Sequence, residues 1–211
     1  MSMIDVITNP QAFFARRDGD LSLVPAVGIV LLIALINVGT GYLTIQVTMS
    51  ALSASAQGFQ TIALVTTVIG GLFGVFVAWL FFGGLFHLLA SVLYDGDGSF
   101  TDTLAVTGWG NVPKIFGGII AFGVTYYVFA IQGVTIPSFS DPQAIQQYAE
   151  SMKHHPLLMV SSVAAIAFKL WSGFIWTFGV STVQDIEVRE AAVVVGIPLA
   201  ISVLYSVYQF V

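Results

Sequence analysis

Residues 62–94 read IALVTTVIGGLFGVFVAWLFFGGLFHLLASVLY, and this stretch decides which kind of fold the chain can adopt. It contains no Asp, Glu, Lys or Arg, and it belongs to a longer charge-free run from Leu21 to Tyr94. A fold in water cannot enclose so much uncharged, mostly apolar chain, because a small domain leaves a large share of its surface exposed. We therefore expect the stretch inside a membrane, where a spanning helix needs about 20 mostly apolar residues.

The composition of the whole chain leads to the same class. Of its 211 residues, 57% are hydrophobic and 8% are charged, whereas an ordinary soluble domain has roughly 25% charged residues. The formal net charge of −5 argues against a basic surface patch for nucleic acid or anionic lipid. These values exclude a soluble globular enzyme, a nucleic-acid-binding protein and a disordered linker, and they leave an integral membrane protein.

The sequence offers no pattern for a metal, a cofactor or catalysis. The chain has no cysteine, so disulfides, thiolate metal sites and cysteine nucleophiles are excluded. His154 and His155 are neighbours that point apart on a helix, whereas zinc needs three or four converging ligands. Residues 95–106 resemble a calcium loop, but Phe100 and Val106 occupy the positions that need Gly and Glu. HExxH, GxSxG and Walker A motifs are absent, so we predict a non-enzymatic protein without metal or cofactor.

Five apolar runs are long enough to cross a bilayer as helices. We place these spans at residues 24–45, 64–92, 112–131, 157–183 and 191–211. A β-barrel is excluded because the apolar runs do not alternate between apolar and polar residues as barrel strands do. The predicted fold class is an all-α, multi-pass protein of the cell membrane that forms one domain over residues 1–211.

Basic residues near the ends of the spans set the expected orientation, since cytoplasmic loops are enriched in Lys and Arg. With the N-terminus inside, the outer side holds only Lys153. The inner side then holds Arg16, Arg17, Lys114 and Arg189. The chain would end outside after five crossings. The first twenty residues lack the apolar core of a cleavable signal, so we expect the first span to act as an uncleaved anchor.

Three segments outside the spans carry signals for short helices. Residues 4–14 are expected to lie against the inner leaflet. Ser99 followed by Asp102 is a capping-box-like pattern, and the helix it would begin is apolar enough to re-enter the inner leaflet half-buried. In the outer connection, Asp141 as N-cap and Pro142 as first residue predict an amphipathic helix. Its apolar face would hold Ile145, Tyr148, Ala149 and Met152.

Lys169 is the most unusual residue of the predicted spans. It lies about 18 Å along its helix, where an ammonium costs roughly 2.5–3.5 kcal/mol on insertion scales. No Asp or Glu lies inside a predicted span to pair with it. It is either a site for a substrate, a lipid phosphate or a proton, or a lysine that bonds to carbonyls and hydroxyls such as those of Ser161, Ser162 or Ser172.

His87 and four glycines are the remaining candidates within the spans. His87 is either part of a polar cavity or proton path with Ser91, or a histidine with one backbone hydrogen bond. The glycines predict close helix packing, either within the bundle or at a dimer face. They are Gly70 and Gly74, which form a GxxxG motif, together with Gly83 and Gly117.

Several short motifs follow one another in a characteristic order. They comprise Asn9, Pro10 and residues 11–14; Gly96, Asp97, Gly98, Ser99 and Phe100; residues 107–110 with Pro113; Ile175 and Trp176; and Ala191 with Ala192. In this order, and with five spans, the chain resembles the Yip-domain family, whose eukaryotic members are named for Rab/Ypt interaction. The resemblance covers nearly the whole chain and is to the prokaryotic branch, and an excess of Asp over Glu and Lys favours a salt-loving archaeal source.

The resemblance implies a cytoplasmic N-terminus and a very short C-terminal tail. Eukaryotic members carry a long cytoplasmic region before the first helix, whereas here it is about twenty residues, too few for a docking surface of standard size. We therefore do not expect Rab-type GTPase binding, and we expect membrane lipids, a membrane protein or a second copy as partners.

Two functions remain open at this point. The first is a membrane-organising or partner-scaffolding protein. The second is a small transporter, channel or lipid-moving protein. In that second case a polar path would be lined by Lys169, His87, Asn37, Asn111 and Lys114.

Overall fold

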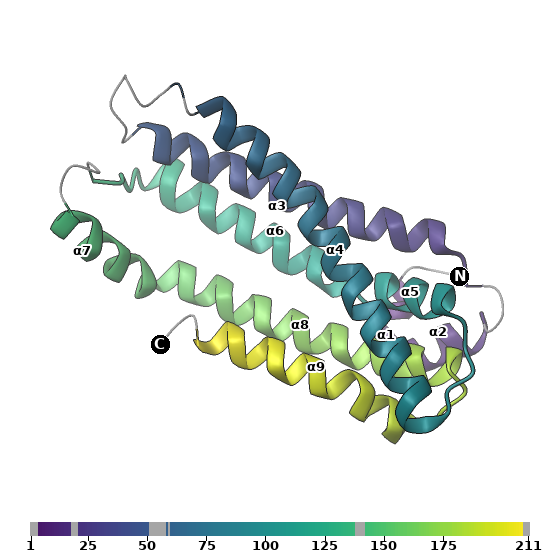
Figure 1. The fold of residues 1–211 in the computed structure, drawn as a ribbon. Helices are drawn as coiled ribbons and strands as arrows, with labels where there is room; N and C mark the ends of the chain where they lie inside the picture. The colour runs from purple at the N-terminus through teal and green to yellow at the C-terminus, as the bar shows by residue number, and fades with distance from the viewer. Residues whose placement is uncertain (1–3, 18–20, 51–57, 59, 138–141, 209–211) are drawn as a thin grey trace.

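The computed structural model describes residues 4–17, 21–50, 58, 60–137 and 142–208, and in these ranges the chain is helical and has no strand. Five helices are long and apolar enough to cross a membrane (Figure 1). They are α3 (Leu23–Ser50), α4 (Gln60–Tyr94), α6 (Val112–Tyr126) with its π-helical continuation η2 (Tyr127–Ile131), α8 (Pro156–Val183) and α9 (Val188–Tyr208). The predicted class, an all-helical protein with five such helices, is confirmed.

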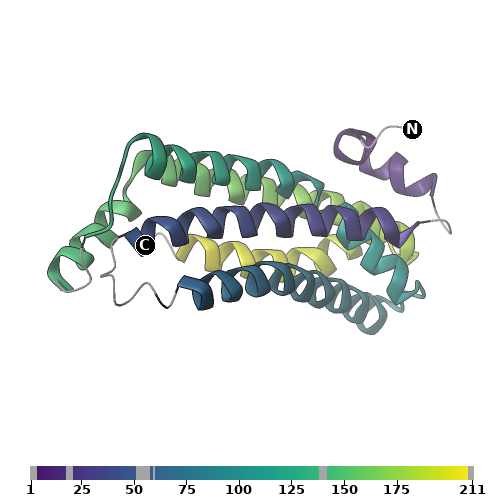
Figure 2. The same ribbon diagram turned by 90° about the horizontal axis from the view of Figure 1, so that it is seen from above.

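The five long helices form a bundle in which each one contacts two of the others. The order around the bundle is α3, α4, α9, α8, α6 and back to α3. Helix α1 and the last turn of α9 lie at opposite ends of the bundle (Figures 1 and 2). Five crossings require this arrangement of the two chain ends. Which end faces the cytoplasm stays a prediction from the charges.

The two ends of the bundle differ, and each is named here after a short helix that marks it. The α5 half comprises residues 4–17, 21–34, 79–117 and 172–198. The α7 half comprises residues 35–50, 60–78, 118–137 and 142–171, together with 199–208. Nearly all buried side chains belong to the α5 half; in the described part of the α7 half, only Val128 and Ser161 are buried.

The N-terminal segment forms two short helices, α1 (Ile4–Thr8) and α2 (Pro10–Ala15), at the α5 end of the bundle. The sequence predicted that this segment lies against the inner leaflet, but its main apolar side chains are buried in the protein. Val6, Phe13 and Phe14 are at most 1% exposed, and α2 packs against α8. Since these side chains fit into the protein core, the segment is a part of the fold and not a separate element on the leaflet.

Helix α5 (Phe100–Trp109) begins as predicted, because Ser99 Oγ accepts a hydrogen bond from the Asp102 N–H at 3.1 Å. The helix is buried more completely than the half-buried helix that the sequence predicted, and its entry into the leaflet stays a prediction. Every residue from Thr103 to Trp109 is buried, because α5 packs against α3, α4 and α8 at once.

Helix α5 leads directly into α6, and both helices pack against α3. Gly108 of α5 lies against Ala26 of α3, and Gly118 of α6 lies against Ile36 further along α3. The end of α5 and the first half of α6 therefore pack along the same helix, α3. The third helix that is long and apolar enough to span is Val112–Ile131, as the sequence predicts, and α5 precedes it inside the bundle.

Helix α7 (Pro142–Lys153) lies in the connection where the sequence predicted a short helix. Tyr148 and Met152 of its predicted apolar face are half-buried, and α7 contacts α8, whereas Ala149 is exposed. Burial raises the pKa of the Tyr148 hydroxyl above its usual value, because desolvation disfavours the phenolate. The predicted N-cap, Asp141, lies outside the described residues.

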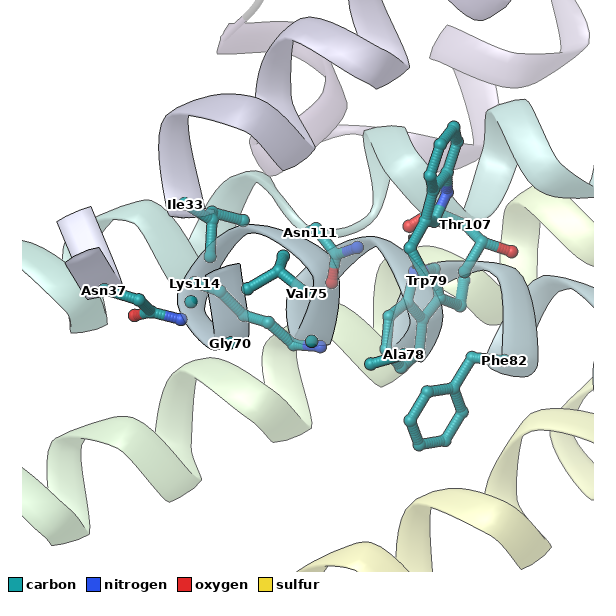
Figure 3. A pocket seen from close by; sticks show the side chains of 13 residues that line it. Ile33, Asn37, Gly70, Val75, Ala78, Trp79, Phe82, Thr107, Asn111 and Lys114 are labelled. Carbon is teal, nitrogen blue, oxygen red and sulfur yellow. Dashed lines mark hydrogen bonds between the residues drawn. The ribbon is translucent and has the colours of Figure 1, made fainter. Parts of the chain in front are cut away.

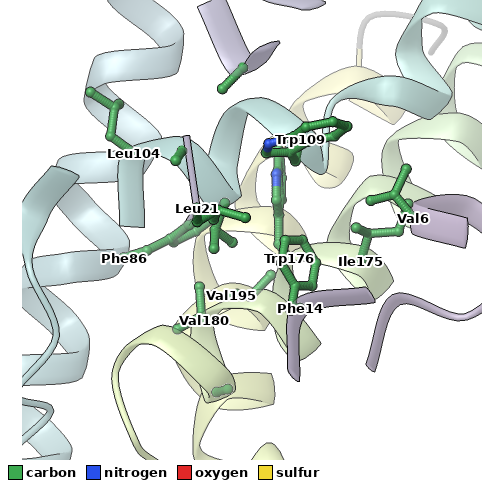
Figure 4. Close-up of a cluster of buried hydrophobic side chains, with 14 of the residues drawn as sticks. Val6, Phe14, Leu21, Phe86, Leu104, Trp109, Ile175, Trp176, Val180 and Val195 are labelled. Atoms are coloured by element: carbon green, nitrogen blue, oxygen red, sulfur yellow. The ribbon is translucent and has the colours of Figure 1, made fainter. Parts of the chain in front are cut away.

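The core of the α5 half is built around aromatic side chains (Figure 4). The Trp176 ring lies 5.9 Å from that of Phe82 and 5.3 Å from that of Phe86, between ring centroids. The Phe13 ring lies 5.1 Å from that of Trp109, between ring centroids. Because large rings dominate the energy of a core, this end holds most of the stabilising contacts of the bundle.

Candidate functional site

The break between α5 and α6 places polar backbone and side chains inside the bundle. Asn111 N–H donates to the Gly108 carbonyl at 3.1 Å, and Lys114 N–H donates to the Asn111 carbonyl at 2.9 Å. These bonds span three residues, which tightens the helix at this point. Pro113 follows directly and has no N–H to donate. The family-motif residue Pro113 thus lies at the break between α5 and α6.

The break lies deep in the bundle. Helix α5 has 10 residues, and a helix rises about 1.5 Å per residue, so its far end is about 15 Å from its exposed start. Lys114 follows in the first turn of α6. Lys114 is thus the third residue of the candidate span Val112–Ile131, near the end where the sequence places it. The charges that support the predicted orientation stay Arg16, Arg17, Lys114 and Arg189 inside against Lys153 outside.

A cavity of about 400 Å³ lies beside the break, and we call it the central cavity (Figure 3). Its polar lining consists of Asn37, Thr107, Asn111 and Lys114. Gly70 and Gly74 of α4 lie at its wall, and a Cβ added at either would meet nothing within 4 Å. These two glycines therefore border open space, and the predicted close packing within the bundle does not occur at them.

Helices pack closely at other glycines, namely Gly71, Gly83 and Gly117. A Cβ at Gly71 would come within 2.8 Å of the Val38 side chain, so α3 and α4 approach each other there. Gly83 meets Leu104 of α5 at the same distance, and Gly117 meets Phe168 of α8 at 3.2 Å. Gly83 and Gly117 are thus located where backbones are close, as small residues at helix contacts are expected to be.

Lys114 is held over an aromatic ring and has no acidic partner among the described residues. Its Nζ lies 4.5 Å from the centroid of the Trp176 ring, and no ion pair involves it. Trp176 is fixed in turn, since its Nε1–H donates to the Thr107 carbonyl at 2.9 Å. That carbonyl is available because the break redirects the Asn111 N–H to Gly108.

The Asn111 side chain, which also lines the central cavity, has a carbonyl oxygen without a hydrogen-bond partner. Asn111 precedes the first residue of α6, but its side chain makes no capping bond, and its Oδ1 is buried without a hydrogen-bond partner. The residue is only 7% exposed. A buried polar atom without a partner is costly and suggests that something outside the chain completes it.

Lys169 lies in the contact between α8 and α9. Its Nζ donates to Ser206 Oγ at 2.6 Å and to Ser202 Oγ at 3.2 Å, and a weaker bond of 3.4 Å reaches the Ser202 carbonyl. Its partners are hydroxyls of α9 and not the α8 serines that the sequence suggested. Lys169 is close enough to Lys114 for the two charges to repel each other, but it does not line the central cavity.

His87 lies apart from both lysines, in a junction near the end of α4. Its Nδ1 is 3.1 Å from Gln184 Nε2, which also donates to Thr103 Oγ1 at 2.6 Å. Gln184 is fully buried. The Phe100 ring covers the imidazole with a centroid distance of 5.9 Å. The contacts of His87 therefore join α4, α5 and the turn after α8, and Ser91 is not its partner.

The motif from Gly96 to Phe100 packs onto the same turn. A Cβ at Gly96 would come within 2.8 Å of Gln184 Oε1, and one at Gly98 would overlap the Val183 carbonyl. The Asp97 N–H also donates to the Gln184 carbonyl at 3.3 Å. Only glycine leaves room for this approach, so the motif connects α4, α5 and the α8–α9 turn.

The N-terminal motif has a comparable local role. Asn9 Oδ1 accepts a hydrogen bond from the Ala12 N–H at 3.2 Å, and Pro10 occupies the first turn of α2. Both residues start the helix that places Phe13 and Phe14 in the core. The described residues contain no group of three His, Asp or Glu side chains placed to hold a metal.

Comparisons with known proteins agree with the motifs. The sequence model of the Yip1 domain matches residues 4–209. An uncharacterized protein of the archaeon Methanocaldococcus jannaschii is 33% identical over 133 residues, which are 61% of this chain and 91% of that protein. No solved structure matches significantly. The chain therefore belongs to the Yip1 domain family, a family of membrane proteins.

Proposed function

We propose that this protein is a non-enzymatic scaffold of the cell membrane, with its N-terminus inside, that organises lipids or other membrane proteins around it. The observation that carries the proposal is the bonding of Lys169. The Lys169 ammonium donates three hydrogen bonds to α9 and thereby connects α8 to α9. A charge that is satisfied by helix packing supports a structural role over transport.

The apolar surface of the α7 half supports the same function. On α4, Phe73 is 66% exposed and Val77 is 60% exposed, although both lie in a helix long enough to span the membrane. The other helices of this chain leave these side chains uncovered. Lipid chains, a membrane protein or a second copy of this chain would cover them.

The alternative function, a transporter, channel or lipid-moving protein, has one observation in its favour. The central cavity collects Asn37, Asn111 and Lys114, three residues of the polar path that such a protein would need. Lys169 and His87, the other two, lie outside its lining. The path is thus interrupted along the bundle, which favours the scaffold.

A reconstitution experiment separates the two functions. Proteoliposomes with the full chain should show no ion flux and no lipid scrambling above protein-free vesicles, and Lys169→Met should change neither rate. Flux or scrambling that Lys169→Met removes would overturn the proposal.

Photo-crosslinking in the native membrane tests the scaffold directly. A photoreactive residue at Phe73 should join the protein to one reproducible partner chain or to a second copy. The same residue at buried Phe86 is the matched control on α4 and should give no such product. Equal products from both positions would contradict a docking role of the α7 half.

A further inference from the structure

We propose that the central cavity binds the phosphate of an anionic amphiphile, with an acidic phospholipid of the surrounding bilayer as its ligand. A small soluble phosphate shares this chemistry, and the experiment below separates the two sources. The inference is independent of the scaffold proposal. The protein can be a scaffold without binding a phosphate here, and it can bind a phosphate here without being a scaffold.

The first argument is charge. Lys114 lies in a membrane-spanning helix, its ammonium faces the cavity, and none of the ion pairs in the described chain involves it. Lys169 adds a second positive charge nearby. A buried ammonium without an acidic partner is costly, and a bound anion removes much of that cost. The net negative charge of the chain is no obstacle, since the acidic residues lie outside the cavity lining.

The second argument is the start of α6. The first turn of a helix carries partial positive charge, and membrane proteins use such helix ends to hold anionic groups. Both Asn111 and Lys114 belong to this turn and line the cavity. The buried Asn111 Oδ1 lacks a donor, so a headgroup with both a phosphate and a hydroxyl would satisfy both side chains.

The third argument is access. The residues Gly70, Gly74 and Ala78 of α4 line the cavity and are exposed on the surface of the bundle. A volume of about 400 Å³ is within the range of small-molecule sites, which is about 300–1,000 Å³. The remaining lining is apolar, with Val75 and Phe82 among it, and suits the first part of an acyl chain. A lipid can therefore enter from the side.

The test uses the full chain, freed of lipid in a neutral detergent. Native mass spectrometry and thermal unfolding are measured with phosphatidylglycerol, phosphatidylcholine or glycerol 3-phosphate. We expect one phosphatidylglycerol molecule per chain, bound at least about tenfold more tightly than phosphatidylcholine, because a charge-assisted hydrogen bond distinguishes the two headgroups. Binding of glycerol 3-phosphate with equal affinity would support the anion site and identify its ligand as soluble.

Variants locate the site. Lys114→Gln should weaken phosphatidylglycerol binding at least about tenfold, while Lys114→Arg should keep it within about threefold, because only the charge is required. Asn111→Asp places a carboxylate beside Lys114 and should abolish binding while raising the unfolding temperature of the lipid-free protein. A raised unfolding temperature shows that this variant is folded.

A matched pair of glycine variants tests the cavity itself. Gly74→Leu fills open space at the cavity wall and should prevent binding. Gly28→Leu fills open space elsewhere, since a Cβ at Gly28 also meets nothing within 4 Å and the residue lies outside the lining. It should leave binding unchanged. Wild-type affinity in folded Lys114→Gln and Gly74→Leu, or equal affinity for phosphatidylcholine, would overturn the proposal.

Discussion

The α5 half and the α7 half of the bundle contain the same five helices, but they are packed in different ways. In the α5 half, short helices α1, α2 and α5 fill the space between the long ones, and Phe13, Phe14, Phe86 and Trp176 are almost completely buried. In the described part of the α7 half, Val128 and Ser161 alone are buried. One half resembles the core of a soluble domain, and the other relies on its surroundings.

The difference shows how a nearly uniform apolar sequence produces an uneven structure. Lipid is as apolar as leucine, so burial of an apolar side chain between membrane helices gains little from the hydrophobic effect. Close packing and hydrogen bonds decide where helices associate. The α7 half has such contacts at Gly71 and Lys169. In the α5 half, two tryptophans also donate to carbonyls of α5, and three short helices fill the space between the long ones.

The largest difference in stability between the two halves is expected from substitutions of two phenylalanines on α4. Phe86→Ala should destabilise the protein by about 3–5 kcal/mol, as truncation of a fully buried ring does. Phe73→Ala should change stability by less than about 1 kcal/mol, because its ring is 66% exposed. Unfolding in neutral detergent, followed by the near-ultraviolet signal, measures both. Equal losses would show that the α7 half is also tightly packed.

The second test compares two glycines. Gly98→Ala should cost about 3 kcal/mol, the upper part of the range for overpacking, since its Cβ would overlap the Val183 carbonyl. Gly74→Ala should stabilise α4 by about 0.5–1 kcal/mol, because the helix gains alanine without a clash. The unfolding midpoints of both variants decide the matter. A folded Gly98→Ala protein with wild-type stability would contradict the tight junction at the motif.

The smallest expected effect concerns glutamine side chains. Gln184→Met removes the hydrogen bonds to His87 and Thr103 and should cost about 1–2 kcal/mol. Gln132→Met is the control in the α7 half, where the residue is exposed, and should stay within about 0.5 kcal/mol. Chemical unfolding of the two variants gives the difference. If Gln184→Met is neutral, the junction does not depend on its polar contacts.

Much of the fold could be predicted from the sequence because membrane spans depend on local composition. The run from Leu21 to Tyr94, the five apolar segments and the cap at Ser99 are properties of neighbouring residues. What failed was the environment of short segments. Val6 and Phe13 belong to a segment whose composition also suits a helix on the leaflet. Only the tertiary structure shows that both side chains are buried in the core.

The candidate site was less predictable. Lys169 was recognised because it lies in the middle of an apolar run, but its partners, Ser202 and Ser206, come from another helix. The sequence predicts Lys114 at the start of the third span, which agrees with the structure, but it does not show that Lys114 lines a cavity.

The sequence by itself determined that this protein is a five-helix membrane protein of the Yip1 domain family, because apolar length and ordered motifs are written along the chain. The tertiary structure decided how the few polar residues are used. In the structure, Lys169 and His87 take part in helix contacts and Lys114 lies at a cavity, although all three lie within predicted spans. The physical reason is that a polar group in a membrane must find partners, and which groups meet depends on helix packing and not on neighbours in sequence.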